Sequence, residues 1–292
     1  MRLFAGACCA CAALAITATA SADAASAAPV EAPHVRLEVL ADHRSVAPGE
    51  EFWVGLVQHI DPGWHTYWVN PGDAGLATRI EWRLPDGYAT DAPQWPVPQV
   101  FRTGPVVTYG YEDRAIVIQR VRTPTAPAAG PIRLSADVHW LVCREACIPE
   151  HATVSIALGR ASTASGTPNA AAAARIATAR AALPDLAPWP AVLSVRRDSL
   201  ALTLRGLARD VPGSAALHFV PLQWGQVDDA VGQTVVRRGA DATLTLTRGD
   251  LKDAPLRSLD GLLLISRGPL KTGPRAFQVH AEAAASAATS DH

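Results

Sequence analysis

Short stretches of alternating apolar and polar residues, separated by turn residues, occupy the chain from Pro33 to Leu158. The clearest are HVRLEVLADH, ATRIEWRLPDGY, RAIVIQRVRTP, GPIRLSADVHWLV and ATVSIALG. Alternation with a period of two places apolar side chains on one face of a strand, and turn residues such as Pro-Asp-Gly end it. Short strands at this spacing predict an all-β region folded as a β-sandwich.

The composition changes after this region. Residues 160–168 are mostly small and polar and read as a linker, and a helix is predicted from Asn169 to Leu183, where Pro184 ends it. More strands with turns follow, so we expect a sandwich domain over residues 32–159 and a second, smaller β domain with one helix over residues 169–283. Residues 284–292 are expected to be a disordered tail.

The first 22 residues have the pattern of a secretory signal peptide. A positive charge at Arg2 precedes an apolar run, and the small residues Ala20, Ser21 and Ala22 fit a cleavage site. No lipid-attachment motif ends the run, so we expect no lipid anchor. Cleavage would remove three of the five cysteines and leave Cys143 and Cys147 in an exported protein, in a compartment where disulfides form.

The charges are nearly balanced, with 26 Lys and Arg against 27 Asp and Glu, and no basic run is present. This argues against nucleic acid as a partner and gives no reason to expect binding to an anionic membrane surface. The single methionine is Met1, so the chain has no Met-rich cluster of the kind that carries soft metals.

Aromatic residues are concentrated in the first predicted domain, which holds six of the eight tryptophans. Large aromatic side chains commonly fill the core and ends of a sandwich, and we favour that role over a ligand-stacking platform. The densest block holds Trp64, His65, Tyr67, Trp68 and Trp82. We interpret its aromatic residues as part of the core and ends of the sandwich, and His59 and His65 as ordinary core or surface histidines.

The segment DVHWLVCREACIPEH places His139, Cys143, Cys147 and His151 four residues apart. On a helix they would share one face and could bind a soft metal. Pro149 would break that helix at a cost of about 3 kcal/mol, and the flanking sequences alternate like strands. We therefore expect a strand–turn–strand hairpin, in which His139 lies about 13 Å from Cys143, too far to share a metal. No metal site is predicted from the four residues.

Three roles remain open for the cysteine pair. As a structural disulfide, a five-residue loop would gain only about 2 kcal/mol from chain entropy, and a bridge over so short a turn is prone to strain and reduction. This favours redox work, but an inert bridge and copper(I) held by the two thiolates stay possible. Arg144 shifts a thiol pKa in the opposite direction to Glu145 and Glu150, so reactivity is not decided by the sequence.

The cysteine segment and the blocks before it resemble the periplasmic N-terminal region of the DsbD/ScsB thiol:disulfide interchange proteins, over most of residues 35–158. The blocks that carry the resemblance are GWHTYWVNPGDAGLATRIEWRLPDGY, WPVPQ, YGYEDRAIVI and WLVCREACIPEHATVSIAL. Several blocks in the same order are more specific than an isolated Cys-x3-Cys. The resemblance implies an immunoglobulin-like sandwich for the first domain, and the region after it is similar to the second part of the longer, ScsB-type version.

The resemblance also implies a function. Cys143 and Cys147 would be a redox pair that takes electrons from a membrane-embedded conduit and passes them to periplasmic thioredoxin-like proteins, with Cys147 forming the mixed disulfides. The disulfide itself would be the redox group, without another cofactor. Phe101 is the candidate shielding residue of a cap loop near residues 101–108. No region resembles the conduit or a thioredoxin-like domain, so we expect those partners to be separate proteins. A copper(I)-binding module and a scaffold with a structural disulfide are the alternatives.

Overall fold

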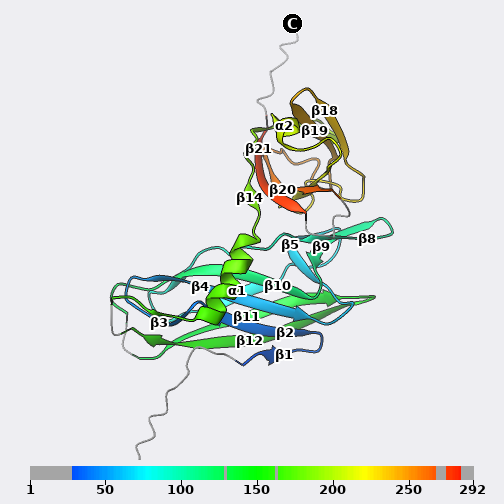
Figure 1. Ribbon diagram of the computed structural model, residues 1–292. Coiled ribbons are helices and arrows are strands. Elements are labelled where there is room, and N and C mark those ends of the chain that lie inside the picture. The colour runs from blue at the N-terminus through cyan, green and yellow to red at the C-terminus, as the bar shows by residue number, and fades with distance from the viewer. Residues whose placement is uncertain (1–27, 128–129, 162–163, 268–273, 284–292) are drawn as a thin grey trace, which may run out of the picture.

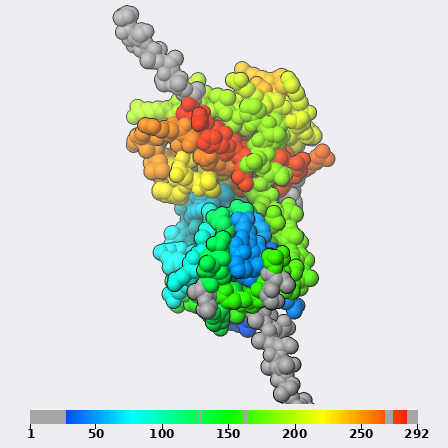
Figure 2. Space-filling model, turned by 90° about the vertical axis from the view of Figure 1, so that its left-hand side faces the viewer, coloured from blue at the N-terminus to red at the C-terminus, as the bar shows by residue number. Residues whose placement is uncertain are grey.

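The computed structural model describes residues 28–127, 130–161, 164–267 and 274–283. The expected signal peptide and C-terminal tail lie outside these ranges. Figure 1 shows a β-sandwich with a second, smaller β-rich lobe beside it, and Figure 2 shows the two lobes in contact. No helix within the described ranges is long and apolar enough to cross a membrane.

The sandwich consists of two five-stranded sheets. One has the order β1 (Val30–Glu31), β2 (Val35–Ala41), β4 (Glu51–Ile60), β10 (Arg114–Arg122) and β7 (Ala89–Thr90). The other has the order β13 (Thr167–Pro168), β3 (His43–Val46), β12 (Cys147–Arg160), β11 (Ile132–Cys143) and β6 (Arg79–Arg83). The all-β prediction is therefore confirmed.

Alternation along the strands builds the core between these sheets. Every second residue of β11 is buried, and β2 and β10 face it with a similar pattern. The innermost side chains include Leu37, Leu56, Leu134, Val138 and Ile156. Burial of side chains of this size contributes about 1.5–3 kcal/mol each, which makes the period-two pattern the main determinant of this fold.

A third sheet lies between the sandwich and the second lobe (Figure 1). It has the order β5 (Thr66–Gly72), β9 (Val106–Tyr111) and β8 (Gln99–Thr103), all antiparallel. The backbones of β5 and β9 approach so closely that a Cβ at Gly110 would overlap the carbonyl oxygen of Thr66. Glycine is thus required where the two strands meet.

Helix α1 (Ala170–Ala181) forms where the sequence predicts it, with Asn169 as N-cap. The Asn169 side chain accepts a hydrogen bond from the backbone N–H of Ala172 at 3.4 Å. The helix packs on the outer face of the first sheet and so belongs to the packing of the first lobe, although it follows the predicted linker (Figure 1). The contact joins Ala172, Ile176 and Ala179 to Leu40, Val57 and Ile118.

The second lobe has its own core between two four-stranded sheets. One sheet has the order β14 (Asp185–Leu186), β21 (Arg275–Glu282), β20 (Ser258–Ser266) and β17 (Ala216–Pro221). The other has the order β15 (Ala191–Val195), β16 (Ser199–Leu204), β19 (Asp241–Thr247) and β18 (Thr234–Arg238). A one-turn helix, α2 (Leu207–Asp210), was not expected from the sequence.

Candidate functional site: the disulfide at the tip of β11 and β12

The cysteine segment forms the predicted hairpin. Strands β11 and β12 are antiparallel, with Cys143 directly opposite Cys147, and a disulfide joins the two residues. A three-residue turn separates them, in which the Arg144 N–H donates to the carbonyl of Ala146 at 3.3 Å. Pro149 is therefore compatible with its position, since it lies in a strand rather than inside a helix.

The two histidines of this segment lie farther along the strands. His139 pairs with His151, and their rings stack at a centroid distance of 5.7 Å, four residues away from the cysteines. Within the described ranges, no three His, Cys, Asp or Glu side chains are grouped as a metal site. The regular four-residue spacing therefore reflects the cross-strand register and does not gather four ligands.

The two sulfurs differ in their surroundings. Cys143 is only 3% exposed, whereas Cys147 begins β12 as an exposed residue. Exposed neighbours continue after Cys147 along the strand through Pro149. An incoming thiolate can therefore approach Cys147, and Cys143 is held inside the protein.

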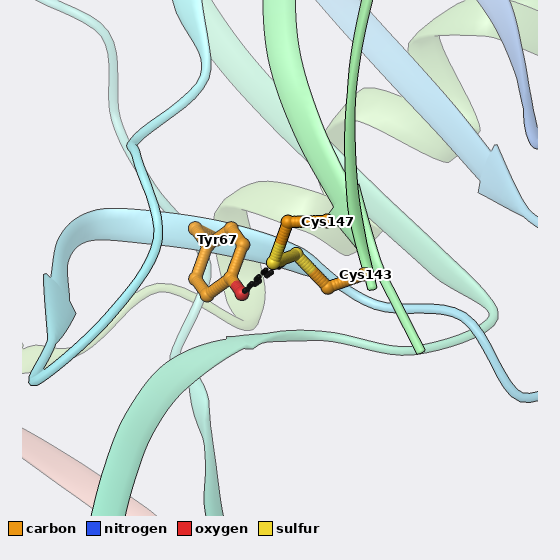
Figure 3. The surroundings of a disulfide bond; sticks show 3 residues. All are labelled: Tyr67, Cys143 and Cys147. Atoms are coloured by element: carbon orange, nitrogen blue, oxygen red, sulfur yellow. Dashed lines mark hydrogen bonds between the residues drawn. A yellow bond between two sulfur atoms is a disulfide. The ribbon is translucent and has the colours of Figure 1, made fainter. Parts of the chain in front are cut away.

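Tyr67 on β5 points its hydroxyl at the disulfide (Figure 3). The hydroxyl donates to Sγ of Cys143 at 2.9 Å and lies 3.6 Å from Sγ of Cys147. Tyr67 is 2% exposed, and burial raises the pKa of its phenol above the usual range. The phenol therefore stays protonated at neutral pH and acts as a hydrogen-bond donor to sulfur.

Because Gly75 has no side chain, the Tyr67 ring can pack directly against its backbone. Its backbone has φ +104°, and a Cβ at this position would overlap the ring of Tyr67. A glycine is therefore required at the end of the NPGDAG block, because the loop after β5 packs its backbone directly against the tyrosine.

The ring of His65 lies between Phe101 and strand β11, which carries Cys143. The backbones of His65 and Cys143 exchange two hydrogen bonds of 2.9 Å, which fixes His65 beside the disulfide. The ring of Phe101 on β8 stacks on His65 at a centroid distance of 5.1 Å, and Phe101 is 8% exposed. Residues from three separate segments, His65, Phe101 and Cys143, are thus brought together.

Two charged side chains near the turn, Arg144 and Glu150, contact tryptophans. The guanidinium of Arg144 lies 5.0 Å from the ring centre of Trp64, which itself stacks on His34 at 3.8 Å. Glu150 is buried, accepts a hydrogen bond from Nε1 of Trp140 at 3.2 Å, and burial raises the pKa of its carboxyl. Arg144 is therefore engaged by an aromatic face beside the turn.

The sequence interpretation of the aromatic block was right for several members and missed one. Trp68 and Trp140 are core residues, 2% and 3% exposed, and the half-buried Trp82 packs against the core and donates to the buried Gln119. Tyr67 was assigned to the core with them, but its hydroxyl contacts the cysteine sulfurs. The available signal was the two-residue spacing of His65 and Tyr67, which places both on the same side of an extended chain.

Residues 37–158 match the family model described as thiol:disulfide interchange protein DsbD, N-terminal. Among solved structures, the chain is similar to the N-terminal periplasmic domain of ScsB from Proteus mirabilis, with a TM-score of 0.61 and 18% sequence identity. The alignment covers 88% of this chain and 98% of that one. A conserved domain protein from Bacillus anthracis aligns with a TM-score of 0.23 and 7% identity, over 87% of each chain. No curated protein matches the chain in sequence.

Proposed function

Because residues 37–158 match the family model of the DsbD N-terminal thiol:disulfide interchange domain, we propose that the chain relays reducing equivalents through Cys143 and Cys147. The observation that carries this proposal is the asymmetry of the disulfide. Cys147 is exposed to a partner, and Cys143 is buried next to a hydrogen-bond donor. A bridge that only staples the hairpin has no need of that donor.

The first step is attack on the exposed sulfur. A thiolate of a reduced partner attacks Sγ of Cys147, the Cys143–Cys147 bond breaks, and a mixed disulfide forms between the partner and Cys147. Cys143 leaves with the electron pair as a thiolate. The Tyr67 hydroxyl, 2.9 Å from that sulfur, stabilises the developing negative charge.

The second step releases the partner. Its second thiolate attacks its own sulfur in the mixed disulfide, and Cys147 leaves as a thiolate that takes up a proton, as does Cys143. The partner dithiol has then become a disulfide, and this pair has gained two electrons and two protons. The same steps in reverse, begun by Cys147, reduce the disulfide of the next protein.

The proposed partners and location are inferred from the resemblance to this family. We propose that the donor is a membrane-embedded electron conduit and that the acceptors are thioredoxin-like proteins of the periplasm. The ScsB domain that this chain resembles is described as periplasmic. In this proposal the disulfide is the redox group and no further cofactor takes part.

One measurement tests the proposal. The chain lacking residues 1–22, so that Cys143 and Cys147 are its only cysteines, is equilibrated with glutathione or thioredoxin buffers, and the fraction of disulfide is determined by alkylation. We expect a potential within the range of exchange proteins. A value below about −300 mV would leave the structural bridge as the better account.

A second measurement distinguishes the electron relay from the alternative of copper(I) binding. Copper(I) titration of the reduced protein and of Cys143→Ser shows whether two thiolates hold the metal. Tight binding that is lost in Cys143→Ser, together with poor exchange against thioredoxin, would replace the relay by a copper-binding function.

A further inference from the structure

The β8–β9 hairpin separates the disulfide from the second lobe. Its register pairs Val100 with Tyr109 and Phe101 with Thr108. Paired residues of an antiparallel hairpin share a face, and consecutive residues point to opposite faces. Tyr109 and Phe101 therefore lie on opposite faces of one thin element.

One face carries Phe101, which stacks on His65 beside the disulfide. The other face is turned toward the second lobe, where Tyr109 bonds Asp229. Its side chains Val100, Val107 and Tyr109 belong to the apolar cluster of the sandwich core, which extends to Val220, Leu262 and Leu264 of strands β17 and β20. The hairpin is thus held from behind by the second lobe on the side opposite the disulfide.

A buried hydrogen bond fixes this rear contact. Tyr109 is 0% exposed, and its hydroxyl donates to Oδ1 of Asp229 at 2.8 Å. Asp229 belongs to the second lobe and is itself buried. Water can hydrogen-bond both groups once the lobe moves away, so this bond favours the closed arrangement by its modest net free energy.

The strand next to the hairpin is attached in the same way. Asn70 on β5 is buried and donates from Nδ2 to the carbonyl of Pro221 at 2.8 Å. Asp73, just after β5, accepts a hydrogen bond from the N–H of Val107 at 2.7 Å. Strand β5 is therefore connected to the second lobe directly through Asn70, and also through its bond to β9, which itself bonds Asp229.

We propose that the second lobe controls access to one side of the Cys143–Cys147 disulfide by holding the β8–β9 hairpin against His65, next to the buried Cys143, with Asp229 as the positioning residue that acts through Tyr109. The inference rests on the proposed exchange at this disulfide. It gives the second lobe a function in a chain whose reactive cysteines both lie in the first. Loosening the Tyr109–Asp229 contact lets the hairpin and Phe101 move away from His65 and opens a second approach to the disulfide, on the side of the buried Cys143.

The rate of reduction by a small dithiol tests this inference. The oxidised chain without residues 1–22 is mixed with excess dithiothreitol, and samples are quenched with a maleimide that shifts the mobility of reduced protein. Tyr109→Phe and Asp229→Ala are each expected to raise the reduction rate about fivefold, the factor that corresponds to the net free energy of one hydrogen bond. Asp229→Asn keeps an acceptor oxygen and should stay close to the wild-type rate.

A matched control lies elsewhere in the second lobe. Asp210 also accepts a hydrogen bond from a buried aromatic donor, Nε1 of Trp189, at 2.7 Å. Asp210→Ala removes a bond of the same kind without touching the hairpin and should leave the reduction rate unchanged. Thermal unfolding of all variants separates a local loosening from a general loss of stability.

The outcomes distinguish this inference from the proposed function. Wild-type reduction rates in folded Tyr109→Phe and Asp229→Ala overturn control by the second lobe, whatever the potential of the pair. If Asp229→Ala does not fold, Tyr109→Phe decides, because it removes a single oxygen. Faster reduction in both variants, with a potential in the range of structural disulfides, supports control of access and rejects the relay.

Discussion

The Tyr67 hydroxyl and Sγ of Cys143 lie 2.9 Å apart inside the protein, although 76 positions separate them in the sequence. A thiolate formed at Cys143 therefore appears next to a donor that is already in place. In an environment that excludes water, such a donor stabilises charge without first having to reorient.

Tyr67→Phe is expected to slow thiol–disulfide exchange about tenfold, because a hydrogen bond to a charged group contributes about 1.5 kcal/mol. The measurement is the rate of reduction by a thioredoxin-like protein. Tyr111→Phe is the matched control, since the buried Tyr111 donates its hydroxyl to the carbonyl of Pro96 at 2.8 Å and not to sulfur. Equal rates in the two variants would remove Tyr67 from the mechanism.

Gly75→Ala should displace the Tyr67 ring and therefore both destabilise the protein and slow exchange. A Cβ at Gly75 would overlap the ring, and φ +104° disfavours any L side chain. Gly104→Ala is the control, because Gly104 also has a positive φ but no atom within 4 Å of a Cβ. We expect urea unfolding to show a loss of more than about 1 kcal/mol for Gly75→Ala. A loss no larger than that of Gly104→Ala, with normal exchange, would contradict the steric account.

Phe101→Ala is expected to speed attack on the disulfide by small thiols several-fold. The ring is 8% exposed and stacks on His65, so its removal opens the side of the disulfide that the hairpin covers. Phe101→Leu keeps an apolar side chain of similar reach and should have an intermediate rate. Combined with Asp229→Ala, Phe101→Ala should add little, because both changes act on the same barrier. An unchanged rate in Phe101→Ala would exclude shielding by this residue.

The hairpin that carries the disulfide could be predicted because its determinants are local. Alternation before Cys143 and after Cys147 indicates two strands, and Pro149 excludes a helix. The strand pattern could not predict the neighbours of the cysteines, since His65 and Tyr67 reach them through long-range pairing. Phe101 was expected near the pair from the family resemblance and not from the pattern. Alternation shows which face of a strand is buried, but it does not show which strand ends meet.

The sequence of strand β4 contains a weak indication that another element, here helix α1, covers its outer face. This strand is buried almost continuously from Val54 to Gln58, where a half-exposed strand would alternate. Such a run indicates that both faces are covered, and Val57 on the outer face contacts the helix. The apolar run alone does not identify the covering element, because any amphipathic helix of the chain would satisfy it.

The carboxyl of Asp229 should make the stability of the protein fall as the pH rises. Burial, as the largest cause, raises the pKa of Asp229 from 3.8 to about 7 in the folded protein. Between these two pH values the folded state holds a proton that the unfolded state has lost, so unfolding becomes easier with rising pH, and the effect levels off above about pH 7. The charged and titratable groups that face this carboxyl or line the same pocket are Tyr109, Asp73, Asp228, Arg102, Arg248, Asp250 and Lys252.

Asp229→Asn isolates the contribution of the Asp229 carboxyl to the pH dependence of stability. His218 has the opposite effect on this pH dependence. Burial and the charge of Arg102 lower the pKa of His218 from 6.5 to about 4, so its titration raises stability as the pH rises between these values. The quantity to measure is therefore the difference in the free energy of unfolding between wild type and Asp229→Asn, by urea titration from pH 4 to 8. We expect the difference to shift in favour of the variant with rising pH, up to about pH 7. A difference independent of pH would show that Asp229 does not titrate in this range and is ionised throughout in the folded protein.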